Sequence, residues 1–200
     1  MSFPERLGIA SRNPGKIREI LEICSDWPVT WVTAEDDPRH WPNVEETGET
    51  YLENATLKAR KVAEALGLPT IADDSGIEVD ALQGAPGVHS ALFAGPHATD
   101  QQNLDKLVAA IGAVPEEART ARYRCVAVAA LGDELVSAEA VCEGRLITDP
   151  RGSGGFGYDP IFIPQEHSDR TMAEHPPEEK NRISHRGKAF RALREKLEPT

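Results

Sequence analysis

Apolar residues recur at the three- and four-residue spacing of amphipathic helices in some stretches and form short runs in others, which predicts a mixed α/β chain. The short runs are rich in β-branched residues or alternate with polar residues, as strands do. We expect strands within 7–10, 29–33, 69–72, 121–131 and 136–143. The helical spacing predicts helices within 17–24, 52–66, 104–111 and 189–197.

Local signals mark where several of these elements begin and end. Thr50 and Glu53 form a capping box before the second helix, and Gly67 ends it. Residues 132–135 form a hairpin connection between the fourth and fifth strands, which we expect in the middle of the sheet. The third helix carries the same start and stop signals, namely Thr99, Gln102 and Gly112.

The loop of residues 11–16, Ser-Arg-Asn-Pro-Gly-Lys, lies between the first strand and the first helix. Asn13 is a good N-cap and Pro14 suits the first helical position. Such a helix start offers backbone N–H groups to an anion, and Lys16 adds a charge, so the loop is a candidate phosphate site. The alternative is an ordinary turn with a surface lysine. It is not a P-loop, because the first glycine of that pattern is missing.

Adjacent carboxylates at Asp73 and Asp74 follow the third apolar run and precede Ser75 and Gly76. Two ionised carboxylates repel each other when desolvated, so a fold tolerates them in water or against a cation such as Mg²⁺. We expect a turn here, with the glycine allowing close approach of a ligand. A solvated turn without a ligand is the alternative.

A second pair of acids, Glu45 and Glu46, lies just before the second helix. Carboxylates within a first turn often serve the helix dipole alone. These two lie outside the helix and are therefore free to reach a metal.

The glycine-rich stretch 151–160 carries Phe156, Tyr158 and Asp159 between its glycines. An aromatic face and a neighbouring acceptor are what a purine site requires. The basic cluster within 178–188, which opens into the last helix, is a candidate site for polyphosphate or a base edge. Its alternative is a solvated charged turn.

Composition narrows the class of protein. The 200 residues carry a formal net charge of -11, which disfavours a protein that wraps nucleic acid. The three cysteines are odd in number and widely spaced, so we expect reduced, buried thiols and neither a disulfide framework nor a zinc site. No apolar run approaches the ~18 residues that span a bilayer, and we expect a cytoplasmic protein with no membrane partner.

Seven motifs occur together and in order along nearly the whole chain, and this combination resembles the inosine triphosphate pyrophosphatase family of non-canonical purine nucleotide pyrophosphatases. They are Ser11-Arg-Asn-Pro-Gly-Lys16, Glu45-Glu-Thr-Gly48, Leu52-Glu-Asn-Ala55, Ala72-Asp-Asp-Ser-Gly76, Gly84-Ala-Pro-Gly87, Gly154-Gly-Phe-Gly-Tyr-Asp-Pro160 and Ser184-His-Arg-Gly187.

The resemblance implies an α/β fold with a long, bent, mixed sheet flanked by helices, forming a single domain, 1–200, of two lobes with a central active-site cleft. It also implies a homodimer. The implied activity is hydrolysis of ITP, dITP and XTP to the monophosphate and pyrophosphate with Mg²⁺, which keeps these nucleotides out of DNA and RNA. All-oxygen ligands would also suit Mn²⁺.

The resemblance assigns roles to individual residues. Glu45 and Asp74 would hold the metal, and Asp74 would also accept the proton of the attacking water. The triphosphate loop would comprise Ser11, Arg12, Asn13, Pro14, Gly15 and Lys16, with Ser75 beside the substrate. The nucleotide would be bound by Phe156, Gly157, Tyr158, Asp159, Lys180, His185 and Arg186, the last two at the altered base edge. Whether Asp73 or Glu46 also contacts the metal stays open.

Two positions depart from the family pattern. The family usually has Thr where Ser11 stands and a small residue where Arg12 stands, so Arg12 either adds a phosphate contact or points outward. Leu92 replaces the family's arginine and receives no substrate role.

Two alternatives compete with this interpretation. A septum-formation-type pyrophosphatase, acting on pyrimidine or modified nucleotides, would carry adjacent arginines after Ser-Pro in its opening loop. A non-catalytic nucleotide- or RNA-binding module is disfavoured by the net charge and by Glu45, Asp73 and Asp74, which would repel phosphate unless a metal lay between them.

Overall fold

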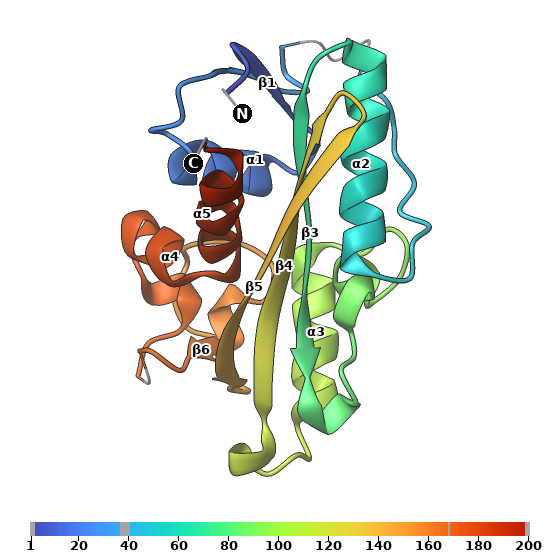
Figure 1. The fold of residues 1–200 in the computed structure, drawn as a ribbon. Coiled ribbons are helices and arrows are strands. Elements are labelled where there is room, and N and C mark those ends of the chain that lie inside the picture. The colour runs from blue at the N-terminus through green and yellow to red at the C-terminus, as the bar shows by residue number, and fades with distance from the viewer. Residues whose placement is uncertain (1–2, 37–40, 168, 199–200) are drawn as a thin grey trace. The chain divides into compact units, whose positions relative to one another are not determined.

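The structure is a computed structural model that describes residues 3–36, 41–167 and 169–198. Its strands are β1 Arg6–Ile9, β2 Thr30–Val32, β3 Thr70–Val79, β4 Thr120–Leu131, β5 Glu134–Leu146 and β6 Phe162–Pro164. Its α-helices are α1 Pro14–Ile23, α2 Tyr51–Leu66, α3 Asp100–Ile111, α4 Pro177–Ile183 and α5 His185–Leu197 (Figure 1).

The strands form one six-stranded sheet in the order β2-β1-β3-β4-β5-β6. β1 pairs in parallel with β2 and β3, whereas β5 and β6 are antiparallel. The predicted mixed sheet with flanking helices is therefore confirmed. The hairpin between β4 and β5 is confirmed too, and both strands are longer than the apolar runs that predicted them.

The chain divides into two compact units. The first comprises Met1–Asp74, Cys125–Ala140 and Arg186–Thr200, and the second comprises Ser75–Arg124 and Val141–His185. β3, β4 and β5 each contribute residues to both.

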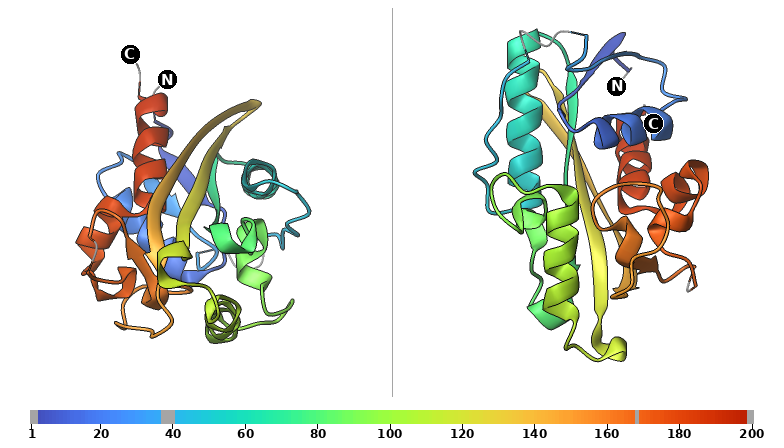
Figure 2. Two further views of the ribbon diagram at one scale, coloured as in Figure 1. Left: turned by 90° about the horizontal axis from the view of Figure 1, so that it is seen from below. Right: turned by 180° about the vertical axis from the view of Figure 1, so that it is seen from behind.

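The core of the first unit is formed by α1 and α5 against β1 and β4. Ile17 and Ile20 from α1 pack with Phe190 and Leu193 from α5 around Ile9 of β1. Within this unit α2 lies across the strands from α1 and α5 (Figures 1 and 2). The faces of β3 in this unit therefore meet different helices.

The start and end of α2 follow the sequence signals. Thr50 accepts from the Glu53 amide and the Glu53 carboxylate accepts from the Thr50 amide, so the predicted capping box is confirmed. Gly67 ends the helix in the left-handed conformation, with φ 64°. This conformation favours glycine because no Cβ clashes there.

The core of the second unit is built around α3. Leu104, Leu107 and Ile111 of this helix are buried, and its capping box is confirmed. Tyr123 and Phe162 pack edge to face in the same core, with ring centroids 4.7 Å apart.

One sequence expectation is wrong, and one alternative does not hold. The turn expected at Asp73–Gly76 is absent, because β3 continues through all four residues. The basic cluster is not a solvated turn: it forms α4, and an extended Ser184 with ψ 154° separates α4 from α5. In both places charged side chains are buried against partners of opposite charge, so the backbone stays regular where sequence patterns suggested a loop.

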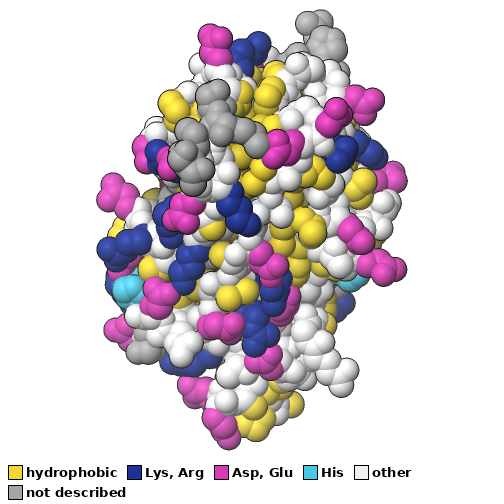
Figure 3. Space-filling model, viewed as in Figure 1, with side chains coloured by type: hydrophobic (Ala, Val, Ile, Leu, Met, Phe, Trp, Pro, Cys, Tyr) yellow, Lys and Arg dark blue, Asp and Glu magenta, His cyan; other side chains and the backbone are white. Residues whose placement is uncertain are grey.

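The remaining expectations from composition concern the cysteines, the membrane and the surface charge. Cys24, Cys125 and Cys142 are buried, as expected, and no disulfide joins them. Among the described helices none has the length and apolar character that a bilayer crossing requires. On the face shown in Figure 3, basic and acidic side chains are interspersed, unlike the basic stripe of a nucleic-acid-binding surface.

Candidate active site

Asp73 and Asp74 point to opposite faces of β3, because successive side chains of a strand alternate. Both are buried, with exposed fractions of 2% and 4%. The repulsion expected between adjacent carboxylates is thus relieved by the strand geometry, and each carboxylate meets its own set of basic groups.

The Asp73 carboxylate is held by Arg186 and Lys16. Its Oδ2 accepts from Nε and Nη2 of Arg186 at 3.2 and 3.1 Å and lies 3.4 Å from Lys16 Nζ. Arg186 also contacts Glu19 Oε2 at 2.5 Å. Burial alone would raise the pKa of Asp73, but Lys16 and Arg186 outweigh burial and hold the pKa well below its usual range. Asp73 is therefore a fixed anion.

The Asp74 carboxylate faces α2, where it meets Lys58 and Asn54. Lys58 Nζ lies 3.0 Å from Oδ1, and Asn54 Nδ2 lies 3.3 Å from Oδ2. Burial raises the pKa of Asp74 to about 6, and the neighbouring Glu46 adds to the rise against the opposing effect of Lys58. A carboxylate with this pKa is suited to accept a proton near neutral pH.

Glu46 joins this group through Lys58, whose Nζ lies 3.2 Å from Glu46 Oε2. The Glu46 side chain is 44% exposed, so desolvation opposes its ionisation only in part, and Lys58 with a hydrogen bond to Asp74 lowers the pKa of Glu46. Glu45, the predicted metal ligand, is exposed.

The donor set suits a hard cation. Asp74 and Glu46, which lie next to each other, offer oxygen atoms, the ligands that Mg²⁺ prefers. Asp74 and Glu46 are also hydrogen-bonded to each other, and two adjacent carboxyl groups favour an added cation. We conclude that these residues fit the predicted Mg²⁺.

The loop 11–16 has the predicted helix start. Asn13 Oδ1 accepts from the Lys16 amide at 3.1 Å, Pro14 opens α1, and Ser11 Oγ accepts from the Asn13 amide at 3.2 Å. The Lys16 side chain is 17% exposed and reaches Asp73, so the surface-lysine alternative does not hold. Arg12, which stands where the family usually has a small residue, donates to the Trp41 carbonyl at 2.5 Å and is thereby bound to the backbone.

In the second unit, Asp159 gathers several of the predicted nucleotide-binding residues. Its Oδ2 accepts from the Phe156 amide at 2.9 Å and from Lys180 Nζ at 2.6 Å. Its Oδ1 accepts from the Tyr123 hydroxyl at 3.2 Å. A Cβ at Gly155, where φ is +70°, would lie 2.0 Å from Asp159 Oδ2, so this position requires glycine.

The other aromatic residues of this region have separate positions. Phe156 is partly exposed, with Lys180 Nζ 5.1 Å from its ring centroid. Tyr158 is buried in the core, and its hydroxyl donates to the Ser90 carbonyl at 2.7 Å. His185 stacks on Tyr123 with centroids 4.5 Å apart. Of the two aromatics in the glycine-rich loop, Phe156 is thus the one that offers a face to a base.

Sequence reasoning assigned no role to Lys58, Asn54 or Glu19. A signal for the first two was present, because residues four apart on a helix share a face. Lys58 lies between Ala55 and Ala59, two fully buried positions, and a lysine on the buried face of a helix indicates a buried partner. Glu19 gave no such signal, because it lies on a helix with many charged residues.

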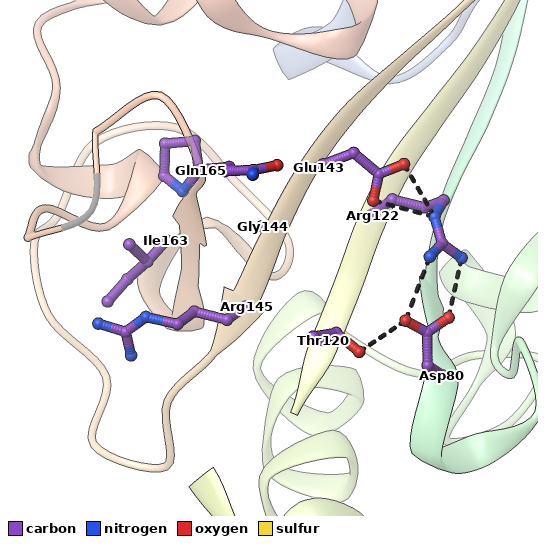
Figure 4. A pocket seen from close by; sticks show the side chains of 9 residues that line it. Asp80, Thr120, Arg122, Glu143, Gly144, Arg145, Ile163 and Gln165 are labelled. Carbon is purple, nitrogen blue, oxygen red and sulfur yellow. Dashed lines mark hydrogen bonds and ion pairs between the residues drawn. The ribbon is translucent and has the colours of Figure 1, made fainter. Parts of the chain in front are cut away.

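A hollow of about 430 Å³ in the second unit is lined by none of the predicted site residues (Figure 4). Arg122 lines this hollow and forms ion pairs with Asp80 Oδ1 at 3.0 Å and Glu143 Oε1 at 3.1 Å. Thr120 also donates to Asp80 at 2.6 Å. Because two carboxylates already compensate Arg122, this hollow is a poor phosphate site.

Comparison with known proteins gives a consistent result. A sequence model described as the Ham1 family matches residues 7–196. The dITP/XTP pyrophosphatase of Streptomyces coelicolor is 53% identical, and the alignment covers 94% of this chain and 94% of that one. The dITP/XTP pyrophosphatase of Geobacter sulfurreducens is 47% identical, with 96% of each chain covered.

Solved structures agree with the sequence relatives. A HAM1 protein from Coxiella burnetii has a TM-score of 0.85 at 40% identity, covering 97% of this chain and 98% of that one. A nucleoside-triphosphatase / dITP/XTP pyrophosphatase from Mycobacterium abscessus has a TM-score of 0.73 at 40% identity, covering 94% and 98%. With relatives this similar over nearly its whole length, the chain belongs to the Ham1 family.

Proposed function

We propose that this protein hydrolyses ITP, dITP and XTP to the monophosphate and pyrophosphate. The relatives named dITP/XTP pyrophosphatases support this reaction. The observation that carries the proposal is the buried Asp74, whose pKa is raised to about 6 and whose partners include Lys58 and Asn54. Cleavage between the α and β phosphates needs such a proton acceptor together with positive charge for the polyphosphate.

The triphosphate is proposed to bind at loop 11–16. At the start of α1 the Gly15 amide is the donor proposed for an anion, because Pro14 has no N–H and the Lys16 amide donates to Asn13; the helix dipole also favours an anion there. Lys16 adds an ammonium group that is already held in place by Asp73. Arg12, tied to the Trp41 carbonyl, is not needed for this binding.

Asp74 is proposed to accept the proton of the attacking water, with Ser75 next to the substrate. Lys58 and Asn54 hold the two carboxylate oxygens and so fix the orientation of the base. Mg²⁺ held by Glu45 and Asp74 would supply positive charge to the polyphosphate and acidify the attacking water. Glu46, paired with Lys58, is the second candidate ligand.

The nucleotide is proposed to bind at the glycine-rich loop. Phe156 offers the ring face, Gly157 and Asp159 fix the loop, and Lys180 is oriented by Asp159. A site that donates a hydrogen bond to the 6-oxo group would leave its donor facing the amino group of adenine. His185 is the better candidate donor, because Arg186 is bound by Asp73 and Glu19.

The test is pyrophosphate release from ITP, XTP, GTP, ATP and UTP, each with and without Mg²⁺. We expect metal-dependent release that favours ITP and XTP. Release from UTP would favour a septum-formation-type enzyme. Release from none of the five would overturn the enzymatic proposal in favour of a binding module.

We further propose that the enzyme is a cytoplasmic homodimer. The resemblance to the family supports the dimer, and the three buried, reduced thiols support a reducing compartment. Light scattering after size-exclusion chromatography would give the mass, and a monomer mass near 21.8 kDa would contradict the dimer.

A further inference from the structure

Three side chains that can bind a metal meet in the second unit, near the start of α4. They are His167, His175 and Glu179, whose ligating atoms all lie within 4.8 Å of one another. His167 lies after β6, His175 follows the turn Met172–Glu174, and Glu179 belongs to α4. None of them has a role in the proposed reaction.

His175 lacks the hydrogen bonds that a buried histidine normally makes. Its side chain is 0% exposed, and neither ring nitrogen has a hydrogen-bond partner of good geometry in the described part of the chain. Its Nδ1 lies 3.2 Å from Glu179 Oε2. Because buried polar groups without partners are costly and rare, this ring calls for a missing water or ion.

The other two residues complete a set of nitrogen and oxygen donors. The rings of His167 and His175 lie edge to face with centroids 4.9 Å apart, and His167 Nδ1 is 3.9 Å from Glu179 Oε1. Arg170 donates to Oε1 at 2.9 Å and so orients the carboxylate, leaving Oε2 beside His175. Metal-binding carboxylates commonly accept a hydrogen bond of this kind from a residue that does not itself bind the metal.

We propose that His167, His175 and Glu179 bind a first-row transition-metal ion such as Zn²⁺. Two imidazoles and one carboxylate are a known zinc ligand set with a fourth position left for water. Ligand atoms around a tetrahedral zinc are about 3.3 Å apart, and the pair His175 Nδ1 and Glu179 Oε2 already has this spacing. His167 would need to move by up to about 1.5 Å to reach this spacing.

The identity of the metal follows from the donors. Imidazole nitrogen suits zinc, nickel, cobalt and copper, whereas Mg²⁺ prefers oxygen. Arg170 places a positive charge beside the carboxylate, so we expect weaker binding than at a closed structural zinc site.

The experiment titrates the metal-free full-length protein with Zn²⁺ by calorimetry, with millimolar Mg²⁺ present to occupy oxygen-ligand sites. We expect one ion per chain. The substitutions His175→Gln and His167→Gln should each weaken binding by at least about 10-fold. The matched control is His97→Gln, an exposed histidine outside the cluster, which should bind Zn²⁺ like the unchanged protein.

Two further readouts separate metal binding from general damage to the fold. Zn²⁺ at about 100 times its Kd should raise Tm by about 5 °C in the unchanged protein and not in His167→Gln, whose half-buried position should tolerate the substitution. Co²⁺ bound at a four-coordinate site should give a strong visible absorption that disappears in the same variant. Equal Zn²⁺ binding by His167→Gln and the unchanged protein, or no binding by either, would overturn the proposal.

Discussion

Asp73 and Asp74 are adjacent in the chain and almost equally buried, yet their surroundings give them opposite properties. Arg186 and Lys16 compensate Asp73 so strongly that its pKa lies well below the usual range. Asp74 has Lys58 nearby but also Glu46, and its pKa is raised to about 6. The face of the strand, rather than the residue type or the depth of burial, decides which carboxylate is a structural anion and which a proton acceptor.

The largest expected effect is on the stability of an Asp73→Asn variant. This substitution leaves Arg186 and Lys16 without their shared carboxylate, and breaking a buried ion pair from one side costs about 3–5 kcal/mol. Urea unfolding measures the loss. The exposed Asp133→Asn is the control, with an expected change within about 0.5 kcal/mol. Equal urea midpoints for the two variants would mean that the ion pairs of Asp73 with Arg186 and Lys16 do not stabilise the fold.

Next in size is the effect of Asp74→Asn on turnover. The amide keeps the shape and can still accept from Lys58, but it takes no proton, so kcat should fall by at least about 10²-fold. Nucleotide binding should change by several-fold at most. Near-normal turnover of ITP by this variant would remove Asp74 from its proposed role.

The same Asp74→Asn variant should be more stable than the unchanged protein at pH 8, which is the opposite of the result at Asp73. The pKa of Asp74 is about 6 when folded and about 4 when unfolded, so folding disfavours its ionisation. Above pH 6 this costs about 1–3 kcal/mol, and the cost disappears as the pH falls toward 4.

Urea unfolding at pH 8 and pH 4 in the presence of a chelator measures this difference. The variant should gain stability over the unchanged protein at the higher pH and lose that advantage at the lower one. A variant that is less stable at pH 8 would show that Asp74 is compensated like Asp73.

The smallest expected effect concerns a third buried carboxylate, Asp159. In Gly155→Ala the new Cβ would lie 2.0 Å from Asp159 Oδ2, so the loop and Lys180 must shift. We expect KM for ITP to rise by about 10-fold, the scale of one misplaced contact. Gly84→Ala is the matched control, because its φ of +86° is also positive but no atom lies within 4 Å. Equal KM values for the two variants would show that Asp159 and Lys180 do not take part in nucleotide binding.

The sequence predicted most of the elements, because capping boxes and hairpin glycines act locally. Thr50 with Glu53 and Thr99 with Gln102 begin their helices as expected. The predicted anion site at the start of α1 likewise depended on the neighbours Asn13 and Pro14. Local signals of this kind need no information from the rest of the chain.

Predictions were less complete where distant residues neutralise a charge. Asp73 lies within a strand rather than a turn because Arg186, 113 residues away, compensates it. The family resemblance assigns Arg186 to the base edge, and the ion pairs of Arg186 with Asp73 and Glu19 were not foreseen. Tyr158 was expected beside a nucleotide and is buried, since its hydroxyl finds the Ser90 carbonyl. Such pairings depend on the folded chain and cannot be read from spacing.

The thiol of Cys125 lies 3.9 Å from Asp73 Oδ2. Burial, reinforced by Asp73, raises the pKa of this thiol, so the reactive thiolate is suppressed beside the ion pairs of Asp73. Oxidants and alkylating agents attack thiolates that solvent can reach. The charged centre around Asp73 would therefore stay intact in the presence of oxidants and alkylating agents.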